Sequence, residues 1–463
     1  MFPFGISDRD PNLLMKSKVL ESSVIPANLR LRFQKGFTWN VVSALFTQGS
    51  TLLANLIIAN ILGKEIFGEY GMIQSTILTL TGIAQVATGV TATKYVAEFR
   101  STNKERTGRV LGLCSVVTLI TGSLAAIILF SSAPWLANHA LNAPYLAQEL
   151  RIASGFVLFS VMNGYQVGTL AGLESYSVLA RVGTLQGVLH VVLCALATWF
   201  WGLEGAIAGF VVSAVIRWFL FHQAIRNEGK KQSILPCYQG LMNERIIFLR
   251  FALPAAISGL SSMPALWLAN ALLVQQPGGY PQMALYSASY SLRSLVIFLP
   301  ALLNNVGMSL LNNQRGLGDD RRYRKVFWTN LIVTLAAALT VALLIAATGR
   351  WLLGLFGKNF TEGYPVLIVL IISTVPETLA VSCYQIIQSQ ARMWLSFFAI
   401  ALPRDIALVI FTYITVPSYG AIGLALAYTI SWVLALIIII SIVWRLGLNI
   451  HGKKMGVQEY SMI

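Results

Sequence analysis

"GFTWNVVSALFTQGSTLLANLIIANILGKEIFGEYGMIQS", residues 36–75, contains two long apolar runs separated by the short polar sequence GKEIFGE. A helix needs about 20 mostly apolar residues to cross the hydrocarbon core of a bilayer. The first run begins near Phe37 and the second near Tyr70, and each is of that order of length. The stretch therefore predicts two membrane-spanning helices joined by a tight turn.

The rest of the chain has the same character. Of its 463 residues, 56% are hydrophobic and 11% are charged, whereas soluble domains average about 25% charged residues. The composition predicts an all-α integral membrane protein with about twelve spans. These begin near Phe37, Tyr70, Gly108, Ala147, Leu179, Leu203, Ile247, Met283, Val326, Gly363, Met393 and Tyr419.

The net charge of +15 comes from basic residues on one side of the membrane. If the N-terminus is cytoplasmic, most of the 33 Lys and Arg residues fall in cytoplasmic connections, including the stretch from Arg217 to Arg250. The positive-inside rule explains this pattern, so we expect both termini in the cytoplasm. Nucleic-acid binding needs basic and aromatic residues interleaved on one surface, and only RRYRK at 321–325 resembles that. We expect no nucleic-acid partner.

The connections between spans are too short to fold as a catalytic domain. The longest internal one runs from His222 to Arg245 and contains no P-loop, no G-x-G-x-x-G and no metal-ligand spacing. The four cysteines and four histidines lie far apart in sequence. We expect no enzyme activity, no catalytic residues, no metal and no cofactor.

Three pairs of similar segments indicate an internal duplication. GLEGAIAGFVVSA from Gly202 aligns with SYGAIGLALAYTI from Ser418, GYQVGTLAG at 164–172 with CYQIIQSQA at 383–391, and APWL at 133–136 with GRWL at 349–352. Copies with an even number of spans insert in the same orientation, as parallel repeats around a central cleft. The expected organisation is a cytoplasmic tail (1–35), an N-lobe of six helices (36–222), a linker (223–246), a C-lobe of six helices (247–445) and a tail (446–463).

Polar residues recur along single faces of several spans. In the first span Gln48 and Asn55 are seven residues apart, which places them on one helix face. Hydrogen bonds between helices would explain such residues singly, at about 0.6 kcal/mol each, but several stripes together favour a polar cleft. The predicted cleft residues are Gln48, Asn55, Gln85, Tyr290 and Asn304.

Arg293 lies inside the apolar eighth span, in YSASYSLRSLVIFLP at 286–300. A central arginine that faces lipid costs about 2.5–3.5 kcal/mol, so its side chain should face a wet cavity or a carboxylate. One hypothesis is an anion site, since guanidinium donates paired hydrogen bonds to phosphate oxygens. The other is an ion pair with Glu377 or Asp405. The sequence leaves both open.

The segment ALPRDIAL at 401–408 places Arg404 beside Asp405 within the eleventh span, and Glu377 follows a proline in the tenth. Carboxylates inside a membrane are candidates for proton or sodium coupling. Glu377 and Asp405 are therefore coupling candidates, with neutralisation by Arg293 or Arg404 as the alternative.

Several of these segments resemble a known family. The motif G-x-x-W-N at Gly36–Asn40, the motif L-G-x-x-x-F-G-x-Y at Leu62–Tyr70, and the sequences GLEGAIAG and YGAIGLA are similar to those of polysaccharide flippases in the multidrug/oligosaccharidyl-lipid/polysaccharide exporter superfamily. The likeness covers about residues 36–445. The family typically has a basic residue where this chain has Asn60, which argues against a cation at the end of the first span.

The resemblance implies a V-shaped, two-lobed transporter with a central polar cleft that alternates access between the two sides of a bacterial inner membrane. Its substrate would be an undecaprenyl-diphosphate-linked O-antigen or capsule repeat unit, moved from the cytoplasmic to the outer leaflet. Arg293 and Arg404 would attract the diphosphate, and the cleft residues would contact sugars. The implied partners are this lipid-linked oligosaccharide, membrane lipid, and polysaccharide polymerase or export proteins.

Two alternatives are weaker. A multidrug efflux antiporter of the same superfamily would share the architecture, but cationic drugs favour an acidic cleft, and the first half has almost no carboxylate within its spans. A membrane polysaccharide polymerase would resemble its relatives in carrying a large external loop with charged catalytic residues, and no such loop is present.

Overall fold

The computed structural model describes residues 27–247, 262–317, 320–388 and 393–445, and every regular element in these ranges is helical. Lipid offers no partners to backbone N–H and C=O groups, and a helix satisfies them internally. Most of both predicted tails, 1–35 and 446–463, lies outside the described residues. The predicted linker 223–246 begins inside a helix that continues to Gln232.

The first lobe consists of five helices, and buried side chains of α2, α4, α5 and α6 share one apolar core that continues into the second lobe. At the start of α4, the side chain of Asn103 accepts a hydrogen bond from the backbone N–H of Arg106, which caps the helix. The helices are α2 (Ala27–Ala84), α3 (Thr88–Phe99), α4 (Lys104–Trp135), α5 (Ala147–Gly172) and α6 (Tyr176–Gln232), with short segments η1 (Leu136–Ala140), η2 (Pro144–Leu146), η3 (Leu241–Glu244) and α7 (Arg245–Ile247).

The second lobe has the same helical character. Within it α10 packs against α11 and α12, and α14 packs against α9 and α12. The helices are α9 (Ser262–Val274), α10 (Gly279–Leu317), α11 (Asp320–Gly354), α12 (Tyr364–Gln388), α13 (Met393–Ser396) and α14 (Leu402–Arg445), with short segments η5 (Lys358–Gly363) and η6 (Phe397–Ala401).

Three of the long helices each cross the membrane twice. Gly63, Gly202 and Gly420 have positive φ angles inside α2, α6 and α14, so the chain reverses there while the hydrogen-bond pattern stays nearly continuous. Seven described stretches are long and apolar enough to span a membrane, and three of them contain such a glycine. With α5 and the shorter apolar α9, this gives about twelve crossings, which confirms the predicted fold class.

The glycine turns also correct the alignment of the two repeats. Gly202 (φ 56°, ψ −131°) and Gly420 (φ 52°, ψ −128°) share one unusual conformation. Three residues later, Gly205 and Gly423 both pack against the backbone of the preceding crossing. The sequence comparison paired Gly202 with Ser418, which is two positions out of register with the turn glycines, because it compared residue letters and not backbone conformation.

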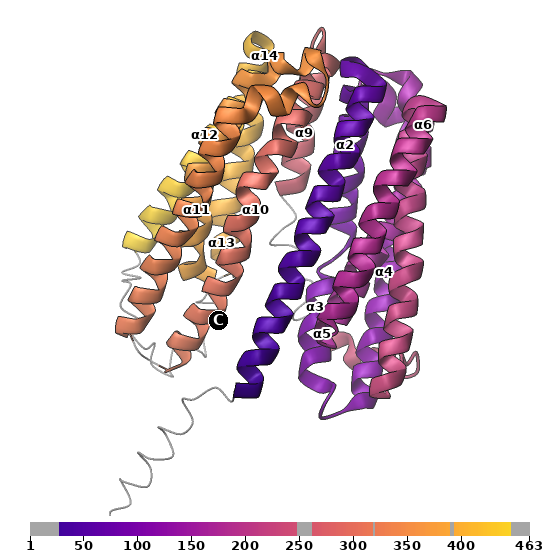
Figure 1. The fold of residues 1–463 in the computed structure, drawn as a ribbon, viewed down its shortest axis with the longest axis vertical. Helices are drawn as coiled ribbons and strands as arrows, with labels where there is room; N and C mark the ends of the chain where they lie inside the picture. Colours follow the sequence, from indigo (N-terminus) through magenta and orange to yellow (C-terminus); the bar gives the residue numbers. More distant parts are fainter. Residues whose placement is uncertain (1–26, 248–261, 318–319, 389–392, 446–463) are drawn as a thin grey trace, which may run out of the picture.

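In Figure 1 the two lobes lie together at one end of the bundle and diverge toward the other, with α2 running between them. We call the first end, where the lobes lie together, the closed end. The opposite end is the open end.

Side chains from both lobes meet at the closed end. Lys64 Nζ is 2.5 Å from a carboxylate oxygen of Glu362, and Asn60 Nδ2 donates to the carbonyl oxygen of Leu355 at 2.5 Å. The buried ring of Phe67 contacts those of Phe356 and Phe360 in the other lobe, at centroid distances of 6.1 and 5.6 Å. A neutral amide at position 60 therefore links the lobes through a backbone carbonyl.

Contacts between the lobes continue toward the middle of the bundle. Trp267 Nε1 of α9 donates to the Thr76 hydroxyl at 2.9 Å. Gln48 Nε2 donates to Ser294 Oγ of α10 at 2.6 Å. Helix α2 thus holds the second lobe on both sides of its turn.

Closure depends on close approach between α2 and α10. A Cβ atom on Gly68 would overlap the carbonyl oxygen of Tyr280. We predict that Gly68→Ala destabilises the closed arrangement by about 1–3 kcal/mol through overpacking, seen as a lower melting temperature of the purified protein.

Gly49→Ala on the same helix is the matched control, because no atom lies within 4 Å of the added Cβ. This change should leave the melting temperature unchanged or raise it, since alanine favours a helix over glycine by about 0.5–1 kcal/mol. Equal melting temperatures for Gly68→Ala and the wild type would contradict the tight α2–α10 contact.

Candidate functional site

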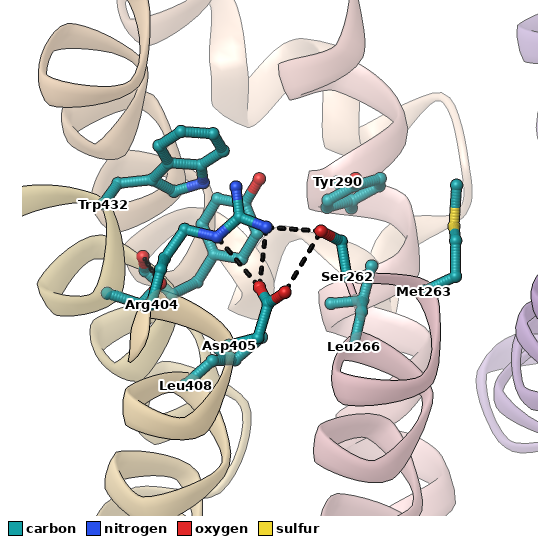
Figure 2. A pocket seen from close by; sticks show the side chains of 10 residues that line it. Ser262, Met263, Leu266, Tyr290, Arg404, Asp405, Leu408 and Trp432 are labelled. Carbon is teal, nitrogen blue, oxygen red and sulfur yellow. Dashed lines mark hydrogen bonds and ion pairs between the residues drawn. The ribbon is translucent and has the colours of Figure 1, made fainter. Parts of the chain in front are cut away.

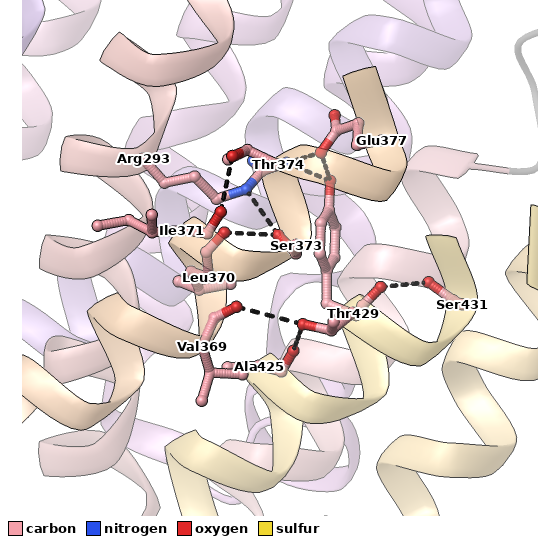
Figure 3. A network of polar contacts seen from close by, with 11 residues as sticks. Arg293, Val369, Leu370, Ile371, Ser373, Thr374, Glu377, Ala425, Thr429 and Ser431 are labelled. Atoms are coloured by element: carbon pink, nitrogen blue, oxygen red, sulfur yellow. Dashed lines mark hydrogen bonds and ion pairs between the residues drawn. The ribbon is translucent and has the colours of Figure 1, made fainter. Parts of the chain in front are cut away.

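Arg293 is buried in the C-lobe between α10, α12 and α14, with 2% of its surface exposed. Its Nη2 donates to a carboxylate oxygen of Glu377 and, at 3.0 Å, to the Tyr428 hydroxyl. Its Nε donates to Ser373 Oγ at 3.3 Å. Figure 3 shows the guanidinium meeting partners from α12. The side chain therefore forms the ion pair that the sequence gave as one of two alternatives for Arg293.

Aromatic rings enclose this ion pair. The guanidinium carbon lies 5.2 Å from the ring centre of Tyr290 and 4.6 Å from that of Tyr428. Tyr286 stacks on Tyr290, and its buried hydroxyl has no hydrogen-bond partner. The ring faces carry partial negative charge toward the cation, and one carboxylate neutralises it.

A second arginine lines a cavity beside this cluster. Arg404 Nε and Nη2 donate to one oxygen of Asp405 at 2.9 and 2.6 Å, and Nη2 also donates to Ser262 Oγ at 2.5 Å. Ser262 in turn donates to the other Asp405 oxygen at 3.1 Å. In Figure 2 the pair from α14 faces Ser262 of α9, and the Trp432 ring lies beside the guanidinium. The charges of Arg404 and Asp405 are thus held together at the wall of the cavity.

The cavity has a volume of about 200 Å³ and mixes aromatic with polar walls. Tyr290 and Tyr428 separate it from Arg293, so the two arginines share these rings but only Arg404 reaches the cavity. A paired guanidinium and carboxylate donate and accept hydrogen bonds without a net charge. The lining residues are Ser262, Met263, Leu266, Tyr290, Arg404, Asp405, Leu408, Tyr428, Ser431 and Trp432.

The structure therefore groups five of the nine predicted site residues in the C-lobe: Arg293 with Glu377, Arg404 with Asp405, and Tyr290 between the two pairs. Gln48 contacts the residue next to this group, because its hydrogen-bond partner in the other lobe is Ser294, which directly follows Arg293 in the chain.

The other three predicted residues lie apart from this group. The Asn304 side chain is buried in the C-lobe, where its oxygen accepts hydrogen bonds from Ser382, Gln385 and Asn330. This is the helix-to-helix bonding that the sequence offered as the alternative. Asn55 is buried in α2, and Gln85 packs beside Gly164 in the N-lobe.

Sequence reasoning missed Ser262, Tyr428 and Trp432. Tyr428 and Trp432 are four residues apart on α14, so they share a helix face. An aromatic pair at that spacing, next to the hydroxyl of Ser431, was the available signal.

The N-lobe has polar residues at positions equivalent to two residues of this cavity. The spacing that relates Gly202 to Gly420 also relates Gln186 to Arg404 and Ser213 to Ser431. Gln186 Nε2 donates to Ser213 Oγ at 3.3 Å, and His190 Nδ1 lies 2.9 Å from the same oxygen. The duplicated positions are thus polar in both lobes, but the ion pair occurs in the C-lobe.

Arg217 is a further arginine that the sequence placed in a cytoplasmic stretch. It lies well inside α6, four residues beyond Ser213, and its guanidinium sits 5.5 Å above the ring of Phe221. Its buried Nε has no hydrogen-bond partner. The helix continues beyond the point where the polar sequence suggested a loop.

A resident metal has no obvious ligands here. Across the ranges that the structure describes, no group of three or more His, Cys, Asp or Glu side chains lies close enough to hold a metal ion. The chemistry available at the C-lobe cavity is hydrogen bonding, ring stacking and charge pairing.

Comparisons with known proteins agree with this architecture. A family model described as "Polysaccharide biosynthesis protein" matches residues 33–306. The chain is 23% identical over 423 residues to the EPS I polysaccharide export inner membrane protein EpsE of Ralstonia nicotianae, covering 87% of this chain and 92% of that protein. It is also 23% identical over 436 residues to the lipid III flippase of Escherichia coli, covering 86% and 95%.

Among solved structures, the inward-facing conformation of a multidrug resistance MATE family transporter of the MOP superfamily superposes with a TM-score of 0.74 at 17% identity. The alignment covers 89% of this chain and 96% of that one. A MOP superfamily transporter from Pyrococcus furiosus gives a TM-score of 0.69 at 17% identity, over 91% and 97%. With a fold of this kind and a family match across more than half of its length, the chain belongs to the polysaccharide biosynthesis protein family.

Proposed function

We propose that this protein moves an undecaprenyl-diphosphate-linked polysaccharide repeat unit across a bacterial inner membrane by alternating access. The observation that carries the proposal is the polar and aromatic cavity of the C-lobe, formed within apolar helices and lined by Arg404, Asp405 and Trp432. Its similar relatives are named as a polysaccharide export inner membrane protein and a lipid III flippase. The chain is a transporter and not an enzyme.

Two features of the cavity lining, a charge pair and aromatic rings, support this choice of substrate class. A lipid-linked saccharide has a polar head that must leave water and a polyprenyl tail that can stay in the bilayer. Sugar rings present hydroxyls at their edges and C–H groups on their faces. The Arg404–Asp405 pair can bond the hydroxyls, and Tyr290, Tyr428 and Trp432 can contact the faces.

Arg404 is the better placed of the two arginines for a diphosphate. Its side chain is 16% exposed and lines the cavity, whereas that of Arg293 is 3% exposed behind Tyr290 and Tyr428. A phosphate oxygen would compete with Asp405 for the guanidinium, since both accept paired hydrogen bonds. We assign Arg293 and Glu377 to holding the rings of Tyr290 and Tyr428 in place. Asp405, and Glu377 in a second role, are the candidates for coupling transport to protons or sodium.

We infer the direction of the cycle from the closed end. If the basic connections face the cytoplasm, the closed end faces outward. The structure then corresponds to a state in which the polar head enters from the cytoplasmic side. Release would require the contacts between Lys64 and Glu362 and around Phe67 to separate.

Multidrug efflux by the same fold is the competing function. A cationic drug would need a carboxylate that lacks a partner. Both coupling candidates in the C-lobe, Glu377 and Asp405, are instead held by arginines. This pairing favours a polar or anionic substrate over a cation.

The proposed function is tested by the sidedness of lipid-linked repeat units in membranes with and without the protein. A sugar-modifying reagent that cannot cross the bilayer would measure the fraction exposed on the outer face. We expect the units to reach that face only when the protein is present. Unchanged sidedness would reject the flippase function, and drug-efflux measurements would then follow.

The role of the buried ion pair is tested by single and double substitution. Arg293→Leu alone should destabilise the protein by about 3–5 kcal/mol because Glu377 stays buried without a partner. Arg293→Leu with Glu377→Leu should restore the melting temperature, because an apolar pair of similar volume is often neutral. We expect the double variant to fold and to lose transport.

Arg350→Leu is the matched control, because this exposed guanidinium also packs on a tyrosine ring, 5.0 Å from that of Tyr364. It should retain transport. Normal transport by the stable double variant would limit Arg293 and Glu377 to a structural contact.

A further inference from the structure

The start of α11 carries a basic cavity that the proposed transport does not use. Arg321, Arg324, Lys325 and Trp328 line a surface cavity of about 470 Å³. Their spacing of three, four and seven residues places them on one face of the helix. All four side chains are exposed. The group combines three cations with one aromatic ring at a single site.

Two tryptophans fix the depth of this cavity in the membrane. Trp328 and Trp351 are both exposed on α11, at 47% and 67%. Their separation of 23 residues corresponds to about 35 Å along a helix, which is slightly more than the hydrocarbon core of about 30 Å. Tryptophan is enriched at the two membrane interfaces, so these residues mark where α11 enters and leaves the hydrocarbon.

The three cations therefore lie at the level of lipid headgroups. Lys325 precedes Trp328 by three residues and Arg321 precedes it by seven, which places them about 5–10 Å beyond the interface. This is the depth of lipid phosphates. Below the tryptophan, the helix surface is apolar and exposed, at Ile332, Val333, Leu339, Leu343 and Leu344.

We propose that this cavity binds an anionic glycerophospholipid. The phosphodiester would lie among Arg321, Arg324 and Lys325, the glycerol region against Trp328, and an acyl chain along the apolar face of α11. Basic clusters next to a membrane span attract anionic lipids, and this one adds a cavity and an interfacial ring that hold one molecule. The site lies on the lipid-facing side of the C-lobe and does not depend on the proposed substrate.

A second basic cluster provides a matched control. Arg226, Lys230 and Lys231 are exposed near the end of α6, at the same end of the bundle. Lys231 is paired with Glu228 at 2.7 Å. This cluster has the same number of cations as the α11 site but lines no cavity with a tryptophan among those described.

The test is retention of lipid by the full-length protein, released from nanodiscs of mixed phosphatidylglycerol and phosphatidylcholine and weighed by native mass spectrometry. In the variant Arg321→Gln/Arg324→Gln/Lys325→Gln, the amount of bound phosphatidylglycerol should fall about tenfold, because each lost cation weakens the attraction to an anionic headgroup. Bound phosphatidylcholine and the melting temperature should not change. Arg226→Gln/Lys230→Gln/Lys231→Gln should lose less than about twofold, as expected for unspecific surface charge alone.

Three outcomes would overturn the proposal. Equal losses in the two triple variants would show unspecific attraction to the surface. Unchanged retention in the α11 variant would show that no lipid is held there. Displacement of phosphatidylglycerol by a polyprenyl diphosphate at equimolar amount would assign the cavity to the transport substrate. The lipid-retention experiment does not measure transport, so a negative result in the sidedness experiment would not change how these three outcomes are interpreted.

Discussion

The C-lobe depends on the charge pair between Arg293 and Glu377. A guanidinium placed within apolar helices needs a nearby anion, since the membrane supplies neither water nor counter-ion. Here α10 supplies the cation, Arg293, and α12 supplies the anion, Glu377. The Tyr428 hydroxyl of α14 accepts a further hydrogen bond from the guanidinium. Three helices that are distant in sequence therefore meet at one ion pair, and separating them would leave a buried charge without a partner.

The same constraint shapes the cavity next to this pair. Tyr290 and Tyr428 contact Arg293 on one side and line the cavity on the other. Arg404 and Asp405 repeat the pairing at the cavity wall, and Ser262 of α9 bonds both of them. Because α9 and α10 also carry the contacts to α2, the cavity and the interface between the lobes share the same helices. A change in the occupancy of the cavity can therefore be transmitted to the packing of the lobes.

Helical spans follow from the sequence because their length and apolar character are local properties. The sequence could also name Arg293, Glu377, Arg404 and Asp405, since a charge within an apolar run is visible without a structure. Which arginine meets which carboxylate depends on packing between helices about 80 residues apart, so two hypotheses for Arg293 stayed open until the structure showed its contact with Glu377. Tyr428 and Trp432 were missed because aromatic residues are common on lipid-facing surfaces, and only the fold turns this face inward. The register of the repeats was misjudged for a related reason. A left-handed glycine turn is a backbone property that a comparison of letters does not weigh.

We propose that the closed end must open during transport. This requirement is tested most directly by Lys64→Cys with Glu362→Cys, in a background whose native cysteines are replaced by alanine. A short thiol-reactive cross-linker that reducing agent cleaves would join α2 to η5 across the lobes, where the native side chains are 2.5 Å apart. We predict that cross-linking stops the movement of lipid-linked saccharide to the outer face and that reduction restores it, while each single cysteine variant treated in the same way remains active. Full transport with the closed end cross-linked would contradict the claim.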